Sequence, residues 1–543
     1  MRNHPLKIVK NLAGGLRSDE HNLHGGRLLK CENLESFDYG LRSYEPIEMV
    51  FSQQQFAAAG VIQRFPFPQL HLGKAFHLLL DSQQMFQVSD QYELYRLDTY
   101  DIATPANSKT IPNGHAWHIA DLNNTAWLFN GACVAIITYT QRMVGSTEKV
   151  LVCDTVRVNC GCYYKGRLLM GGFHPDYQFS SSWKTLYETL ADQRSLTFDY
   201  TVGLDRSSVM WSTIGGGDLL YMFDYNRAMT GHLTTAEGLT ANLWSASNPY
   251  ALEATKRNDG GSAKLDIGEV LAIKVLGEHA IVYGSKGIKV LTHSYEPVSG
   301  TPAFREAHLS DIGVPYGGAV GGNDKQHCIV GTDGRLRLIR LDQGLPYIRE
   351  IGYSEFFKSH VNSAIAVSYD SFQNRFLIGT GARTYVLNFV NIGDAAGVPA
   401  LTWATQQVTS VVAGRGADMV GRGVGVGTHA DYISNTGKFK VGAFDMGTRG
   451  HKTITGAELH GDIDTDAYII YHYALKDNKE FTELDPEIFS PDGEIKFNVE
   501  GIDINVEVTF DDFRKVVLNS MTLHRYYTDL RHTRGQHADT DVA

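Results

Sequence analysis

Three cysteines in the segment CDTVRVNCGC lie close enough together to be compared with a metal site. They are Cys153, Cys160 and Cys162. A zinc site needs ligand pairs separated by two to four residues together with a fourth ligand, and this segment has neither. We therefore expect three buried thiols in strands.

Two pairs of histidines could present imidazoles to a metal. The pairs are His71 with His77, and His115 with His118. Neither pair comes with a carboxylate arranged as an obvious co-ligand. We interpret these side chains as structural histidines.

The segment GDIDTDAY places Asp462, Asp464 and Asp466 at alternate positions, as at the start of a calcium-binding loop. Such a loop requires glycine at its sixth place and glutamate at its twelfth. This chain has Ala467 and Tyr473 at those places. The pattern therefore does not predict a calcium site.

The glycine spacing in GRGADMVGRGVGVG, residues 414–427, superficially matches a dinucleotide fingerprint, but a strand-like run follows it instead of a helix. The hydrolase motif G-x-S-x-G and the zinc-protease motif H-E-x-x-H do not occur in the sequence. We predict no catalytic, cofactor-binding or metal-binding residues, no cofactor, and a protein that is not an enzyme. A propeller enzyme acting on polysaccharide stays open, because its paired carboxylates would leave no sequence motif.

One unit repeats along the chain: an apolar strand, a short polar turn and a second strand. It occurs in AIVYGSKGIKVLT, HCIVGTDGRLRLI and RFLIGTGARTYVLNF. The glycines at the ends of the first strands, 47 or 48 residues apart, are Gly284, Gly331, Gly379 and, in a weaker copy, Gly427. A period of about 40 to 50 residues built from short strands is typical of β-propeller blades. We predict about six blades, in a range of five to seven, with these glycines at equivalent turns.

Composition agrees with an all-β fold, because 55 glycines, 27 tyrosines and 25 phenylalanines suit tight turns and aromatic-lined strands. Helix-period stretches are few, the best being residues 181–195 and 354–366. We predict four regions: an extended N-terminal lead-in, residues 1–69; a β-propeller with insertions, residues 70–435; an antiparallel β-sandwich, residues 447–530; and a tail, residues 531–543.

No segment approaches the roughly 20 apolar residues that cross a membrane, and the first residues lack the apolar region of a signal peptide. Six cysteines are too few and too unevenly spread to form a disulfide framework. We expect the chain to fold in a cytoplasm, to keep its thiols reduced and not to insert into a membrane.

Acidic charge is concentrated near the end of the chain. Residues 447–543 hold 19 acidic and 10 basic side chains and so carry −9 of the formal net charge of −11. Such a surface does not grip nucleic acid, but a DNA duplex can slide past it. A solvated face is the simpler interpretation. The candidate acidic wall consists of Asp462, Asp464, Asp466, Asp485, Glu487, Asp511 and Asp512.

Three stretches of the chain suggest a family. The N-terminal stretch LAGGLRSDEHNL with GRLLKCENLESFDYGLRSYEPI resembles the opening of tail nozzle or tail hub proteins of tailed bacteriophages. The segment VMWSTIGGGD, residues 209–218, is similar to strand-and-turn segments of their propellers. The closing stretches KTITGAEL, AYIIYHYAL, GIDINVEVTF and LHRYYTDLRHTRG resemble the terminal sandwich and Arg-bearing tail of phage virion proteins.

The resemblance implies a structural component of a phage tail. Its copies would form a ring, commonly of six, that is part of the conduit for DNA ejection. Expected partners are adaptor and portal-proximal proteins, tail fibres or spikes, and duplex DNA that passes through the lumen without specific binding. The protein would be located in the virion tail after folding in the host cytoplasm. A tail depolymerase and a cytoplasmic protein-interaction scaffold are the alternatives.

Overall fold

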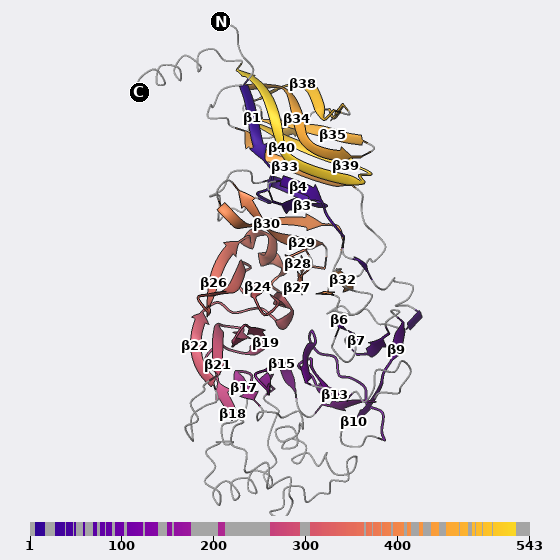
Figure 1. The fold of residues 1–543 in the computed structure, drawn as a ribbon, viewed down its shortest axis with the longest axis vertical. Helices are drawn as coiled ribbons and strands as arrows, with labels where there is room; N and C mark the ends of the chain where they lie inside the picture. The colour runs from indigo at the N-terminus through magenta and orange to yellow at the C-terminus, as the bar shows by residue number, and fades with distance from the viewer. Residues whose placement is uncertain are drawn as a thin grey trace, which may run out of the picture. The chain divides into compact units, whose positions relative to one another are not determined.

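The computed structural model describes residues 6–527 with gaps. The longest gaps are 17–27, 50–57, 60–68, 139–148, 175–204, 212–260, 294–303, 414–422, 427–435 and 445–451. The described residues form two compact units (Figure 1). We call residues 48–372 with 409–430 the propeller unit, and residues 1–47, 373–408 and 431–543 the sandwich unit.

The propeller unit contains a series of small, mostly antiparallel sheets, each built from strands that follow one another in the chain. The first is β6 (Gln69–Leu72), β7 (His77–Leu80), β8 (Met85–Val88) and β9 (Leu94–Arg96). The second is β10 (Asp98–Asp101), β14 (Lys149–Cys153), β13 (Val134–Thr138), β12 (Thr125–Phe129) and β11 (His118–Leu122), in which β10 and β14 run parallel. The third is β15 (Val158–Tyr164), β16 (Arg167–Phe173), β17 (Ser208–Trp211) and β18 (Gly261–Lys264).

The next two sheets are the most regular. The fourth is β19 (Val270–Leu276), β20 (His279–Gly284), β21 (Ile288–His293) and β22 (Phe304–Ser310). The fifth is β23 (Val320–Gly322), β24 (Gln326–Val330), β25 (Leu336–Asp342) and β26 (Leu345–Gly352). The unit also contains β27 (Ala366–Asp370) and a sheet of β31 (Ser410–Ala413), β32 (Gly423–Val426) and β5 (Glu48–Met49).

Successive sheets pack face to face, and this packing forms the core of the propeller unit. Separate apolar clusters join the first sheet to the second, the second to the third, the third to the fourth and the fourth to the fifth. In the last of these clusters, Ile281 of β20 and Ile329 of β24 are both fully buried. Each sheet therefore completes its neighbour's core, which is the packing expected of propeller blades.

One strand at an edge of each sheet, together with β27, lies beside the corresponding strand of the next sheet, and these strands form a ring. Among the described residues, β11 packs against β15, β15 against β19, β23 against β27, β27 against β31, and β31 against β6. A hydrogen bond of 2.9 Å between His71 Nε2 and Asp121 Oδ2 joins β6 to β11. The His327 Nε2 atom lies 3.0 Å from the Val275 carbonyl oxygen and links the fourth sheet to the fifth. The residues that the structure describes supply seven strands to this ring, β6, β11, β15, β19, β23, β27 and β31, and the fold is an all-β propeller.

The sandwich unit consists of two sheets, one of which follows the order β28 (Arg375–Gly379), β29 (Thr384–Ile392), β30 (Ala395–Ala404), β2 (Leu28–Glu32), β33 (Gly437–Phe444), β39 (Asp503–Asp511), β35 (Ala467–Leu475) and β36 (Phe481–Glu483). The short strand β37 (Glu487–Ile488) also pairs with β35. The other sheet contains β3 (Leu34–Phe37), β4 (Gly40–Ser43), β40 (Lys515–Tyr527), β34 (Lys452–Asp464) and β38 (Glu494–Gly501), with β1 (Leu6–Asn11) beside β40.

The sandwich is built from strands in which alternate side chains are buried. In β38, exposed and buried residues alternate along the whole strand. In β39, the side chains of Ile504, Val506, Val508 and Phe510 are all buried. Since side chains of a strand point alternately to its two faces, this pattern gives each sheet one apolar face. Strand β3 packs on β29, β30 and β33 of the opposite sheet.

The extended N-terminal segment supplies strands to the sandwich unit. Strand β1 pairs antiparallel with β40, from Leu6 opposite Arg525 to Asn11 opposite Ser520, and the indigo and yellow strands lie side by side in Figure 1. Strand β2 lies between β30 and β33. The two units therefore differ in their bounds from the ranges predicted from the sequence. Strands from the start of the chain pair with strands from its end, so both belong to the same sheets.

The helical content of the described residues is small. The stretch 354–366 forms only α5 (Ser354–Phe357) and the 3-10 turn η3 (Lys358–His360). The stretch 181–195 and the predicted tail lie outside the described residues. No helix in the described part of the chain is long and apolar enough to cross a membrane. All six cysteines are buried, and none of them forms a disulfide.

Candidate functional site

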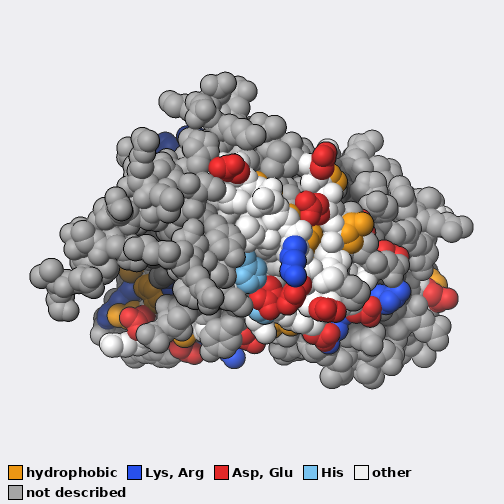
Figure 2. Space-filling model, turned by 90° about the horizontal axis from the view of Figure 1, so that it is seen from above, with side chains coloured by type: hydrophobic (Ala, Val, Ile, Leu, Met, Phe, Trp, Pro, Cys, Tyr) orange, Lys and Arg blue, Asp and Glu red, His pale blue; other side chains and the backbone are white. Residues whose placement is uncertain are grey.

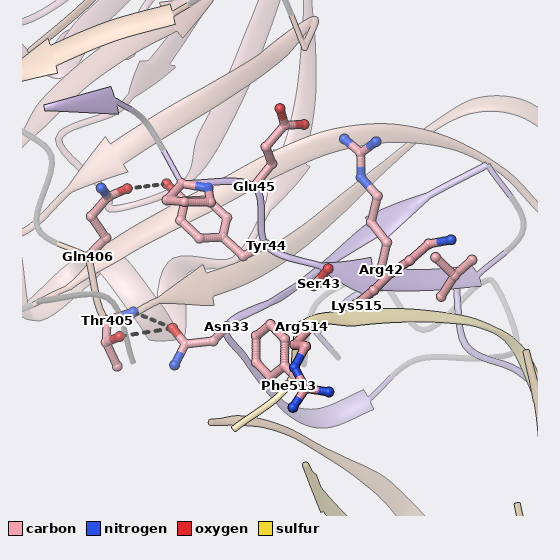
Figure 3. A pocket seen from close by; sticks show the side chains of 12 residues that line it. Asn33, Arg42, Ser43, Tyr44, Glu45, Thr405, Gln406, Phe513, Arg514 and Lys515 are labelled. Carbon is pink, nitrogen blue, oxygen red and sulfur yellow. Dashed lines mark hydrogen bonds between the residues drawn. The ribbon is translucent and has the colours of Figure 1, made fainter. Parts of the chain in front are cut away.

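The sandwich unit contains a cavity of about 500 Å³ (Figure 3). Three stretches of chain line it. The first begins directly before β3 and continues past the end of β4, and it supplies Asn33, Arg42, Ser43, Tyr44, Glu45 and Pro46. The second, after β30, supplies Thr405 and Gln406, and the third, where β39 turns into β40, supplies Phe513, Arg514, Lys515 and Val517. We call this cavity the hairpin pocket. Its volume is within the range of pockets that bind small ligands or single peptide segments.

Asn33 fixes one wall of the hairpin pocket. Its backbone has φ 53°, a left-handed conformation that asparagine tolerates better than most residues. The side-chain Oδ1 accepts hydrogen bonds from the backbone N–H of Thr405 at 2.7 Å and from its hydroxyl at 3.0 Å. The Nδ2 group donates to the Thr436 carbonyl at 2.8 Å. One asparagine thus ties together three segments that are far apart in sequence.

A buried ionic network lies behind the pocket. The Glu35 carboxylate accepts a bond of 2.5 Å from Arg375 Nη1 and one of 2.7 Å from Arg42 Nε. Glu35 and Arg375 are 0% and 1% exposed. Asn388 adds a hydrogen bond of 2.8 Å from its Nδ2 group to the Ser36 carbonyl. A buried ion pair is tolerated when its polar atoms are matched in this way.

Tyr44 connects the ionic network to the cavity. Its ring lies under the Arg375 guanidinium, 5.1 Å from the ring centroid. Its hydroxyl donates to Gln406 Oε1 at 2.9 Å, as the dashed line in Figure 3 shows. A cation above an aromatic face is attracted by the electrons of the ring. Both the ring and the hydroxyl of Tyr44 are therefore held in place, so the side chain forms a rigid part of the pocket lining.

The mouth of the pocket carries exposed cations. Arg514 donates from Nη1 to Asp464 at 3.0 Å, and Lys515 donates to Asp462 at 2.6 Å. The hydrogen bond with Asp462 raises the pKa of Lys515. Pairs as exposed as these are weak, because water screens the charges. The carboxylate of a ligand could therefore replace Asp464 at Arg514 or Asp462 at Lys515.

The lining residues are suited to binding. Arginine and lysine can hold a carboxylate, Tyr44 and Phe513 offer aromatic surface, and the amides offer hydrogen bonds. None of the residues that line the hairpin pocket is a histidine or a cysteine. Ser43 therefore has no base of that kind beside it within this lining. The lining thus offers groups that can bind a ligand carrying a carboxylate and apolar surface.

The structure places three of the four turn glycines. Gly284 ends β20, Gly331 directly follows β24, and Gly379 ends β28, so each stands at the end of the strand that precedes a turn. A Cβ atom on Gly284 would lie 2.2 Å from the Ile267 carbonyl oxygen, and one on Gly331 would lie 2.3 Å from the Arg337 guanidinium. Gly427 lies outside the described residues.

The acidic residues singled out from the sequence are dispersed in the sandwich unit. Asp462 and Asp464 are in the ion pairs just described, and Asp512 has φ 46° in the turn between β39 and β40. Asp485 is exposed and Glu487 is partly exposed. Asp511 ends β39, and Asp466 lies outside the described residues. Figure 2 shows acidic side chains spread over the described part of one face, with basic and histidine side chains between them.

The cysteines and histidines considered as metal ligands occupy the propeller unit. Cys153 ends β14, while Cys160 and Cys162 lie on β15. Burial raises the pKa of Cys162 to about 12. The described residues contain no group of three or more histidine, cysteine or acidic side chains placed to hold a metal ion.

The four histidines are placed in the first two sheets. His71 lies 2.9 Å from Asp121, and His77 is buried at the start of β7. His118 begins β11, and burial together with the nearby Lys274 lowers its pKa to about 3. His115 precedes this strand, and its backbone N–H donates to the Asn130 carbonyl at 2.7 Å.

Sequence reasoning missed the hairpin pocket. Its residues come from segments separated by more than 300 positions, as the hydrogen bond between Tyr44 and Gln406 illustrates. One sequence signal was present: the lining residues Asn33, Arg42 and Tyr44 all lie within CENLESFDYGLRSYEPI, part of the N-terminal stretch that carries the phage resemblance. The charged residues in an otherwise strand-like stretch were a hint that it contains a buried polar site.

Comparisons with known proteins add little to this description. No protein-family model matches the chain, and no curated protein matches it. Among solved structures, the Neurospora crassa Pan2 WD40 domain has a TM-score of 0.30 at 7% identity, covering 64% of this chain and 82% of that one. The Cps50 (Swd1) β-propeller domain from Myceliophteria thermophila has a TM-score of 0.32 at 9% identity, covering 63% and 88%.

An enzyme is also among the structural neighbours. The exo-β-1,3-galactanase from Phanerochaete chrysosporium has a TM-score of 0.24 at 9% identity, covering 78% of this chain and 98% of that one. At these scores the likenesses carry no argument about function. The assignment as an all-β propeller protein rests on the strand order and packing of the chain itself.

Proposed function

We propose that this protein is a non-enzymatic structural component of a bacteriophage tail, whose copies form a ring of about six around the path of the ejected DNA. The observation that supports it best is the position of the N-terminal stretch that resembles tail nozzle proteins. That stretch builds the hairpin pocket and supplies Glu35 to the buried network. Residues that resemble a family of assembly proteins thus form a recognition site.

The scaffold suits a part under mechanical load. Strand β1 is paired along its length with β40, so the first and last described strands of the chain are joined by a ladder of hydrogen bonds. Strand β5, from near the start of the chain, completes a sheet with β31 and β32. Opening either unit therefore requires breaking strand pairs between distant parts of the chain. That property favours a rigid element in an assembly.

The charge distribution suits a conduit for DNA. The formal net charge is −11, and the acidic side chains of the sandwich unit alternate with paired cations. A wall of this kind offers phosphates few places to bind, so the duplex passes without sticking. Adaptor and portal-proximal proteins, and fibres or spikes, are the proposed neighbours of the ring.

The test is the location of the chain in particles. Cryo-electron microscopy of phage particles that encode this sequence should show its propeller and sandwich units in a ring around the tail axis. Purified protein should bind duplex DNA weakly or not at all at about physiological salt. Absence of the chain from purified tails would contradict the proposal, and so would tight, steeply salt-dependent binding of DNA.

A further inference from the structure

The sandwich unit exposes an apolar side chain directly after two acidic residues. Ile488, on the edge strand β37, is 69% exposed, the largest exposure among the big hydrophobic side chains of the described residues. It follows the partly exposed Glu487 and the exposed Asp485 and Pro486. We call residues 485–488 the acidic segment. An isolated apolar side chain on a surface is common, but one that follows acidic residues in an exposed segment has the chemistry of a docking peptide.

The acidic segment is held in a fixed shape. Ile488 stands opposite Ile469 and Glu487 opposite Ile470 in the pairing of β37 with β35. The next residue, Phe489, is buried and anchors the segment to the core. Beyond it, the Ser490 hydroxyl donates to the Glu494 carbonyl at 2.7 Å. A segment that is ordered before binding loses little conformational freedom when a partner covers it.

The hairpin pocket has the complementary chemistry. Its lining contains three cations, Arg42, Arg514 and Lys515, and one carboxylate, Glu45. Its aromatic and aliphatic surface is supplied by Tyr44, Phe513 and Val517. A carboxylate and a neighbouring isoleucine would thus each find a matching partner. The carboxylates that pair with Arg514 and Lys515 are exposed, so an incoming carboxylate can replace them at little cost.

We propose that the acidic segment of one copy of this chain docks in the hairpin pocket of the next copy. Within one chain the two surfaces do not meet, because Ile488 is exposed and does not line the cavity. The contact joins two different surfaces and is therefore heterologous. Such contacts generate a closed ring when the rotation between copies closes, and an open filament when it does not.

This inference rests on the proposed ring of copies and names the surfaces that make it. The acidic composition of residues 447–543 favours a second copy as the occupant over a nucleic acid, because phosphates approaching the pocket would meet exposed carboxylates such as Asp462 and Asp464. A single peptide segment brings only one or two charges and avoids most of that repulsion.

The experiment is a complementation test by sedimentation velocity with the full chain. Ile488→Asp removes the apolar side chain of the acidic segment, and Arg514→Glu reverses a cation at the pocket mouth. Each variant alone should be monomeric at concentrations where the wild type associates, with affinity reduced at least about tenfold. An equimolar mixture should form dimers, since one variant retains an intact pocket and the other retains an intact segment.

A matched control is Leu345→Asp, because Leu345 is 67% exposed and lies on β26 of the propeller unit. It should associate as the wild type does. Far-ultraviolet circular dichroism and melting temperature establish that each variant is folded. Unchanged association of Ile488→Asp and Arg514→Glu would overturn this contact. The ring would then have to form through other surfaces of the chain. A wild type that stays monomeric at every concentration would overturn both the contact and the ring.

Discussion

The two units are stabilised in different ways. In the propeller unit, apolar clusters between successive sheets form the core, and each of the first five sheets packs on the sheet that follows or precedes it in sequence. In the sandwich unit, strands from the start, middle and end of the chain share sheets, and a buried ionic network joins them. The apolar packing of the propeller unit recurs from sheet to sheet along the chain. The buried charges of the sandwich unit instead require particular partners, such as Glu35 and Arg375, at fixed positions.

This difference predicts where a single substitution is most damaging. Glu35→Ala would leave the Arg375 guanidinium buried without its carboxylate. We expect the free energy of unfolding of the sandwich unit to fall by about 3–5 kcal/mol, because an uncompensated buried charge is strongly unfavourable. Urea denaturation measures the change. The double variant Glu35→Gln, Arg375→Met should lose less than the single one, and a larger loss would show that the charges are not the cause.

In the propeller unit the expected effect is smaller and steric. The Cβ atom of Gly284→Ala would lie 2.2 Å from the Ile267 carbonyl oxygen, a backbone atom that cannot move aside. We expect a loss of about 3 kcal/mol in the free energy of unfolding of this unit, at the upper end of overpacking costs. Gly344→Ala is the control, because nothing lies within 4 Å of its added carbon although its φ is 84°. It should cost about 1 kcal/mol, and equal losses would contradict the account.

The propeller unit should also lose stability in mild acid. His327 is fully buried; its Nε2–H donates to the Val275 carbonyl at 3.0 Å, and its Nδ1 accepts from the Tyr283 hydroxyl at 2.6 Å. Burial together with Lys274 lowers the pKa of His327 to about 3. The unfolded chain binds a proton near pH 6.5, so the stability that neutral His327 contributes is lost as pH falls below that value. At pH 5 the loss should be about 2 kcal/mol, from about 1.4 kcal/mol per pH unit.

Denaturation of the propeller unit at pH 7 and pH 5 tests this expectation. His327→Gln keeps an amide that can meet Tyr283 and Val275 but does not titrate in this range. Its stability should change less between the two pH values than that of the wild type. The same pH dependence in both proteins would assign the effect to other groups.

The smallest effect is expected at the mouth of the hairpin pocket. Lys515 and Asp462 form a pair of 2.6 Å, but both side chains are more than half exposed. Lys515→Ala should leave the denaturation midpoint of the sandwich unit within experimental scatter, because solvent screens such pairs. A loss comparable with that of Glu35→Ala would mean that the stability of this unit depends on surface charge more than on the buried network.

The repeat was readable because a propeller blade is local in sequence. The spacing of Gly284 and Gly331 in the sequence was enough to predict the two turns. The structure adds the reason for glycine there, because neighbouring backbone or side-chain atoms leave no room for a Cβ atom. The hairpin pocket was not readable in this way. Nothing in the sequence links Glu35 to Arg375, since the pairing depends on which strands become neighbours after folding.

The acidic segment shows the same limit. Apolar and polar residues alternate in GEIKFNVEGIDINVEVTF, residues 493–510, which is typical of an antiparallel sandwich, and β38 and β39 have the buried and exposed faces expected of one. Which acidic residues would meet a cation was not predictable, because Asp462 and Asp464 lie on β34 and their partners Lys515 and Arg514 lie on or directly before the neighbouring strand β40. Pairing of charges is decided by strand register, which the composition does not contain.

Negative-stain electron microscopy of the purified chain tests the central claim most directly. The account predicts ring-shaped particles with a central opening, made of about six copies. It also predicts their disappearance in Ile488→Asp while the protein stays folded. Single, separate particles of the wild type at every concentration would contradict it.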